Sequence, residues 1–101
     1  MIYYIDIDDT LCTLLVPMDY ESAVPIRKAI DKVNALYDVG HRIIIWTARG
    51  TVTGKDWREV TESQFKTWGL KYHELKFGKP YYDCFIDDKN INSVDWLNEK
   101  D

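Results

Sequence analysis

The residues best equipped for chemistry form an acidic run near the N-terminus, Asp6-Ile7-Asp8-Asp9-Thr10, which follows mainly apolar residues. Side chains alternate along a continuing strand, so Asp6 and Asp8 can converge on one site only where the chain begins to turn. One carboxylate could then attack a phosphorus atom while the other handles a proton, as nucleophile and general acid/base. A lone pair of this kind is equally compatible with a surface turn of solvated aspartates.

A second acidic pair, Asp87-Asp88, directly follows the apolar segment 83–86. Magnesium takes oxygen ligands and usually keeps several waters. Asp6 and Asp87, with a backbone carbonyl from the first turn, would supply part of such a shell. Without a cation, gathering these acids costs roughly 4 kcal/mol for a pair 4 Å apart at an intermediate dielectric. The two clusters therefore predict a Mg²⁺ site.

Three further side chains are candidates for holding a phosphate. Thr47 follows the apolar run 43–46 and could donate its hydroxyl, and Lys79 could neutralise the charge of phosphoryl transfer. Arg49 could pair with a phosphate or a carboxylate, and a surface ion pair is the alternative. Each is a weak signal alone, because threonines often cap turns and most lysines are solvated.

The elements that must position these residues alternate between strand and helix. We expect strands at 1–5, 41–46, 72–76 and 83–86, helices at 24–39, 54–68 and 94–97, and an irregular flap at 11–24. This order predicts an α/β fold: a Rossmann-like three-layer sandwich with a mostly parallel sheet of about four strands and helices on both faces. Ligands bind such sheets at the carboxyl ends of the strands, where Asp6, Thr47 and Asp87 would meet.

The bulk properties narrow the class of protein. A length of 101 residues predicts a single domain, 1–101, without room for a second. Seventeen acidic against thirteen basic residues, with no basic tract, argue against a nucleic-acid partner. No stretch is long enough to cross a membrane, and Cys12 and Cys84 are expected to be reduced thiols. We therefore expect a cytoplasmic protein.

The ordered set of motifs resembles the haloacid dehalogenase (HAD) superfamily of phosphohydrolases across nearly the whole chain. The first family motif is similar to Ile5-Asp6-Ile7-Asp8-Asp9-Thr10-Leu11, the second to Ile43-Ile44-Ile45-Trp46-Thr47, the third to Lys79 and the fourth to Asp87-Asp88. One departure is Asp9, which stands where many relatives have glycine. Aspartate is among the few other residues that tolerate unusual dihedral angles.

The resemblance implies a role for each site residue. Asp6 would be the nucleophile that forms a transient aspartyl phosphate, and Asp8 would protonate the leaving oxygen and then activate water. The substrate would be bound by Thr10, Thr47, Arg49 and Lys79, and Mg²⁺ by Asp6, the Asp8 carbonyl, Asp87 and, through water, Asp88. Neither insertion point holds a cap domain. In Asp9-Thr10-Leu11-Cys12 and Trp46-Thr47-Ala48-Arg49 the chain is also similar to short bacterial phosphatases of capsule and surface-polysaccharide synthesis, which implies a small phosphorylated substrate such as a sugar phosphate.

Other functions remain open at this stage. A nucleotidase or a phosphatase of nucleic-acid ends would use the same catalytic residues. A non-catalytic phospho-acceptor domain would need an acceptor aspartate on a middle strand, but here that strand ends in Trp46-Thr47. An inactive binding module is less favoured, because no essential residue is missing. Self-association is also left open.

Overall fold

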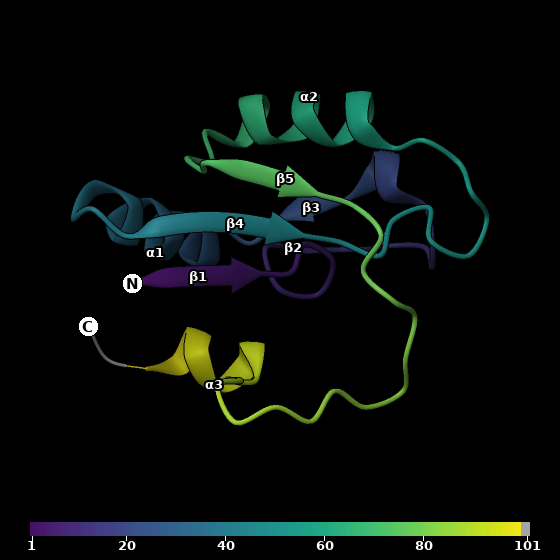
Figure 1. The fold of residues 1–101 in the computed structure, drawn as a ribbon. Helices are drawn as coiled ribbons and strands as arrows, with labels where there is room; N and C mark the ends of the chain where they lie inside the picture. Colours follow the sequence, from purple (N-terminus) through teal and green to yellow (C-terminus); the bar gives the residue numbers. More distant parts are fainter. Residues whose placement is uncertain (100–101) are drawn as a thin grey trace.

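The computed structural model describes residues 1–99 (Figure 1). The larger elements are β1 (Ile2–Ile5), α1 (Arg27–Asp38), β4 (Arg42–Trp46), α2 (Arg58–Trp68), β5 (Glu74–Lys76) and α3 (Ser93–Asn98). The predicted flap contains β2 (Cys12–Thr13), a 3₁₀ turn (η1, Tyr20–Ser22) and β3 (Val24–Pro25). None of the helices within residues 1–99 is long and apolar enough to cross a membrane.

The main sheet contains three parallel strands in the order β1-β4-β5. Ile5 pairs with Ile45 of β4, and Trp46 of β4 pairs with Lys76 of β5. The central strand is apolar throughout its middle, and Ile43, Ile44 and Ile45 are all buried, as expected for a strand with a neighbour on each side. The strands predicted at 1–5, 41–46 and 72–76 are thus confirmed, with slightly shorter bounds.

The first helix begins later than predicted. Val24 and Pro25 pair with Cys12 and Thr13 in a short antiparallel ribbon, β2-β3, and the helix starts only at Arg27. The ribbon holds the flap against the start of α1.

The three helices contribute to one apolar cluster. Ala29, Ile30 and Val33 of α1 and Phe65 and Trp68 of α2 are buried in it together with alternate residues of the sheet, while Trp96 and Leu97 of α3 pack against it. The buried residues of α1 and α2 share this cluster with Ile43 and Ile45 but not with Ile44, so both connecting helices cover the same face of the sheet. The prediction of helices on both faces is therefore not reproduced in the part of the chain that the structure describes.

The fourth predicted strand, 83–86, is wrong for this conformation: within residues 1–99 the main sheet has three strands, and residues 83–86 belong to neither sheet. Phe85 and Ile86 remain 40% and 92% exposed, so this short apolar run buries little surface that could stabilise a strand. The Asp87 carboxylate instead accepts a hydrogen bond from the Lys89 backbone N–H, a local turn that competes with strand pairing. In Figure 1 this segment is part of the long connection that leaves the carboxyl end of β5 and runs past β1 to α3.

Candidate active site

A tight turn directly after β1 interrupts the strand at Ile7. The Ile7 carbonyl oxygen accepts hydrogen bonds from the backbone N–H groups of Thr10, Leu11 and Cys12, at 3.2, 2.8 and 3.3 Å. Asp9 adopts a φ of 62°, in the left-handed region that aspartate enters more readily than most residues. Aspartate thus fills a position where glycine would also fit. The turn provides the local geometry that Asp6 and Asp8 need to converge.

Asp6 lies at the carboxyl end of β1 beside the ammonium group of Lys79. The Lys79 Nζ is 3.7 Å from the Asp6 Oδ1, and the Lys79 backbone N–H donates to the Thr47 carbonyl oxygen at 3.1 Å. Burial raises the pKa of the Asp6 carboxyl, and the charge of Lys79 opposes this shift. The carboxyl ends of strands β1, β4 and β5 thus bring a carboxylate and a cation together at one edge of the sheet.

Asp8 forms a two-pronged ion pair with Arg49. The Arg49 Nη2 lies 2.8 Å from the Asp8 Oδ1, and the Arg49 Nε lies 3.1 Å from the Asp8 Oδ2. The Arg49 side chain is fully buried, whereas the Asp8 side chain retains 19% exposure. Arg49 is thus paired with a carboxylate here, and the pair is inside the protein rather than on its surface. This geometry fixes the plane of the Asp8 carboxylate.

Two polar residues of α2 complete the surroundings of Arg49. Its Nη1 donates to the Thr61 Oγ1 at 3.0 Å and to the Gln64 Oε1 at 2.7 Å, and its guanidinium lies 4.9 Å from the Tyr20 ring. Thr61 and Gln64 were not among the site residues predicted from the sequence. Their three-residue spacing on the inner side of α2 was the available signal, because polar residues on an apolar helix face need buried partners.

Thr47 lies below the surface at the end of β4, with 1% exposure. Its hydroxyl oxygen accepts a hydrogen bond from the Arg49 backbone N–H at 3.1 Å. This bond uses the hydroxyl as an acceptor and leaves its hydrogen for donation to another oxygen. Thr10 is half-buried in the turn after β1.

Cys12 is a buried thiol that supports the Asp8 carboxylate. Its Sγ donates to the Asp8 Oδ1 at 3.4 Å. Burial, with a further contribution from the Asp8 charge, raises the pKa of Cys12 to about 12. The side chain therefore stays a neutral hydrogen-bond donor and is a poor nucleophile.

The second acidic pair does not reach the first in this conformation. Asp87 and Asp88 are exposed, and the hydrogen bond from the Lys89 backbone N–H, followed by one from Asp88, lowers the pKa of Asp87. Within residues 1–99 no group of three or more His, Cys, Asp and Glu side chains is gathered closely enough to hold a metal ion. The donor types suit Mg²⁺, but their arrangement here does not fit it.

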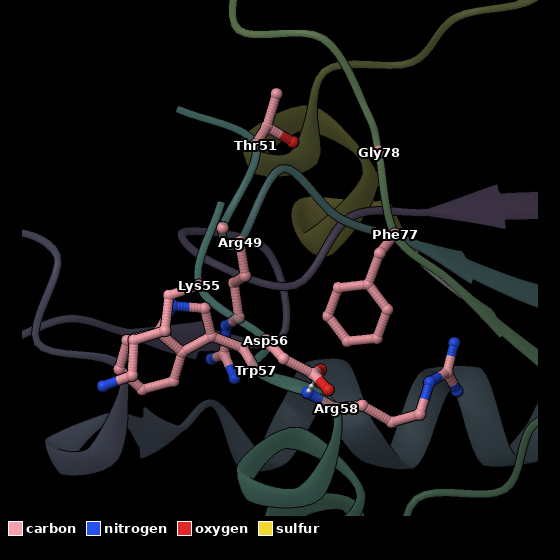
Figure 2. Close-up of a pocket in the computed structure, with 9 residues that line it drawn as sticks. Arg49, Thr51, Lys55, Asp56, Trp57, Arg58, Phe77 and Gly78 are labelled. Carbon is pink, nitrogen blue, oxygen red and sulfur yellow. Dashed lines mark hydrogen bonds between the residues drawn. The ribbon is translucent and has the colours of Figure 1, made fainter. Parts of the chain in front are cut away.

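A cavity of about 310 Å³ opens beside this site, between the loop after β4 and the end of β5 (Figure 2). Its lining residues are Arg49, Gly50, Thr51, Lys55, Asp56, Trp57, Arg58, Phe77 and Gly78. The lining begins two residues after Thr47 and ends one residue before Lys79. The hydroxyl of Thr51 donates to the Lys79 carbonyl oxygen at 2.8 Å and ties the two walls together.

Comparison with known proteins supports the fold alone. No protein-family model and no curated protein matches the chain. A target protein from Vibrio cholerae with a known crystal structure superposes with a TM-score of 0.86 and 22% identity, over 98% of this chain and 89% of that one. A chain from the structure of a Pnkp1/Rnl/Hen1 complex superposes with a TM-score of 0.63 and 18% identity, over 97% of this chain but 33% of that one.

Proposed function

We propose that this chain is a magnesium-dependent phosphomonoesterase of the HAD type that forms an aspartyl phosphate on Asp6. The observation that carries the proposal is the arrangement at the carboxyl edge of the sheet. There the Asp6 carboxylate lies 3.7 Å from Lys79, and the nearby Asp8 carboxylate is held on both oxygens by Arg49. A nucleophile, a separately fixed proton carrier and a cation for phosphate charge are the groups that phosphoryl transfer to a carboxylate requires.

The reaction then has two balanced steps. An Asp6 oxygen attacks the phosphorus, the bond from phosphorus to the leaving oxygen breaks, and Asp8 gives its proton to that oxygen. Asp8 next removes a proton from a water molecule, which attacks the phosphorus. The bond between Asp6 and phosphorus breaks, releasing inorganic phosphate and restoring the carboxylate. Lys79 and the Thr47 hydroxyl bind the phosphoryl oxygens in both steps.

Arg49 is a positioning residue in this scheme, because it acts through Asp8. Asp8 Oδ1 accepts hydrogen bonds from Arg49 and Cys12, whereas Oδ2 accepts one from Arg49 and has a further lone pair that can carry a proton. Thr61 and Gln64 hold the guanidinium from its other side. The Asp8 carboxyl group therefore keeps one orientation while it donates a proton and later accepts one.

Magnesium requires one change in the conformation described above. We propose that residues 83–86 pair with the free edge of β1, which brings Asp87 towards Asp6 and completes a Rossmann-like sandwich. Two exposed apolar segments support this pairing, since it would bury part of the surface of each. They are Cys84-Phe85-Ile86 and, in β1, Ile2 and Tyr4. The proposed substrate is a small phosphorylated metabolite.

Hydrolysis of para-nitrophenyl phosphate tests the chemistry. We expect turnover that requires Mg²⁺, stops with a chelator and is lost in Asp6→Asn, while circular dichroism shows that the variant is folded. Reduction of the reaction mixture with borohydride should convert the acyl phosphate on Asp6 to homoserine, which mass spectrometry detects. An exposed ion-pair variant, Asp31→Asn, is the matched control and should retain activity. Full activity of Asp6→Asn would rule the proposal out.

A further inference from the structure

We propose that the cavity between Gly50 and Gly78 binds the leaving group of the substrate, and that this group carries a second anionic charge. The proposal rests on the proposed phosphatase function for its chemistry but names a different part of the molecule. The cavity would select phosphate esters with a carboxylate or a second phosphate over neutral esters of the same size.

The position of the cavity suits a leaving group. Its walls follow the carboxyl ends of β4 and β5, whereas Asp6 follows the carboxyl end of the adjacent strand β1. The three strand ends therefore place nucleophile, phosphate-binding residues and cavity in a row along one edge, where ligands of parallel sheets bind. Its volume of about 310 Å³ lies at the low end of the range of roughly 300–1,000 Å³ for small-molecule sites. A small leaving group fits this space.

The charge of the cavity predicts the charge of its ligand. Three cations and one carboxylate line it, and one of the cations, Arg49, is already paired with Asp8. The carboxylate of Asp56 accepts a hydrogen bond from the Arg58 backbone N–H. Among residues 1–99, the side chains of Lys55 and Arg58 form no ion pair with a carboxylate. Other described cations, such as Lys28 and Lys66, also form no ion pair, so what distinguishes Lys55 and Arg58 is their place in the cavity lining. The cavity is thus locally cationic in a chain whose net charge is −4.

The cations are held by their surroundings. The Lys55 ammonium lies 4.1 Å from the centre of the Trp57 ring, and the Arg58 guanidinium lies 4.9 Å from that of Phe77. The Arg58 Nη2 also donates to the Leu75 carbonyl oxygen at 3.3 Å. Figure 2 shows Lys55 beside the Trp57 ring and Arg58 below Phe77. Side chains placed in advance lose less entropy when they bind an anion.

The backbone of Gly50 shapes the part of the cavity wall that lies against Lys55 and Trp57. Its φ is +80°, and a Cβ at this position would come within 2.1 Å of the Lys55 carbonyl oxygen. A larger residue would push the loop between Thr51 and Trp57 away from the site. Glycine thus allows the close packing that brings Lys55 to the cavity.

Matched phosphate esters test the proposal. Sorbitol 6-phosphate and 6-phosphogluconate share an open six-carbon chain and differ only in a terminal hydroxymethyl or carboxylate. We expect the wild type to prefer 6-phosphogluconate by about tenfold in kcat/KM, the change that one charge-assisted hydrogen bond supplies. Arg58→Gln and Lys55→Gln should each reduce this preference by lowering kcat/KM for the anionic ester more than for the neutral one. Sorbitol 1,6-bisphosphate distinguishes a carboxylate from a phosphate as the preferred anion.

The control is Lys66→Gln, which removes an exposed cation of α2 outside the cavity lining and should retain the preference. Binding is followed in parallel through the indole N–H resonance of Trp57. If no ester is hydrolysed, the phosphatase proposal fails, but tighter binding of the anionic ester that Arg58→Gln abolishes still supports the cavity. Equal use and equal binding of the esters by the wild type, or a preference that survives in both variants, would overturn it.

Discussion

At the scale of single residues, the site combines a partly buried carboxylate, Asp6, whose side chain is 37% exposed, with a fully buried guanidinium, Arg49. Asp6 has a carboxyl whose pKa is raised by burial, with only partial relief from Lys79. Arg49 has a fully buried guanidinium that depends on Asp8, Thr61 and Gln64 for its hydrogen bonds. The surroundings of Asp6 disfavour its charged form, whereas those of Arg49 stabilise its charged form with hydrogen bonds. Removing each residue should therefore change stability in opposite directions.

Asp6→Asn should make the protein more stable at neutral pH. A carboxyl whose pKa is higher in the folded state contributes stability below its unfolded value of 3.8, and this contribution is lost as the pH rises through the folded pKa. At pH 7 the ionised Asp6 is therefore unfavourable, and a neutral amide removes that penalty. Thermal unfolding at a series of pH values should show a higher Tm for the variant at pH 7 and a shrinking difference towards pH 3.8. Asp31→Asn should show no such gain, and a lower Tm for Asp6→Asn at pH 7 would contradict the argument.

Arg49→Lys should lower both stability and kcat. Lysine keeps the charge but cannot reproduce the planar fork that contacts Asp8, Thr61 and Gln64. Breaking a buried ion pair costs about 3–5 kcal/mol, so urea unfolding should show a loss in that range or somewhat less, since the charge remains. If Arg49 positions Asp8, kcat falls more than KM changes and the pH profile of kcat moves.

The comparison variant is Arg42→Lys, whose ion pair with Glu74 is about half exposed on both sides. It should cost at most about 1 kcal/mol and leave the pH profile in place. An Arg49→Lys enzyme with reduced stability but an unchanged pH profile would show that Arg49 is structural only.

At the scale of elements, the sequence was most informative where an apolar run also had a neighbour to pair with. Residues 43–46 of β4 are apolar and lie between two strands, and this element appears where it was predicted. Residues 83–86 have the same local character but no partner in the described sheet, and they do not form a strand. A short apolar run indicates that the segment tends to be buried, but not which strand it pairs with. Tertiary contacts decide the pairing.

Labelling of Cys84 tests whether this segment can pair with β1. Cys84 is exposed and Cys12 is buried, so an alkylating reagent should modify one thiol in the folded protein and two in urea. If Mg²⁺ gathers Asp6 and Asp87, residues 83–86 become ordered against β1 and the labelling rate of Cys84 falls severalfold. Asp87→Asn should remove this protection, whereas Asp31→Asn should keep it. An unchanged rate at saturating Mg²⁺ would mean that the segment stays as described here.

At the scale of the whole molecule, chain order predicted the edge at which the candidate residues gather but not their contacts. Asp6, Thr47 and Lys79 follow successive strands, so a parallel sheet places them together whatever their detailed packing. The pairing of Arg49 with Asp8 joins residues 41 positions apart, and it depends on how α2 packs against the turn. Such side-chain partners leave no local pattern in a single sequence.

Magnesium should therefore stabilise the entire fold if it binds between these distant segments. A ligand that binds only the folded state at about 100 times its Kd adds about 2.7 kcal/mol. For a domain of this size that corresponds to a rise in Tm of about 10 °C or more. Scans at constant ionic strength should show this rise with MgCl₂, and a chelator should reverse it. Asp6→Asn and Asp87→Asn should each lose most of this rise in Tm, because each removes one of the carboxylates proposed to bind the ion. Asp31→Asn should keep it. A Tm that Mg²⁺ does not change would leave Asp87 without a role in metal binding, and would favour a phosphate site built by Asp6, Asp8 and Lys79 alone.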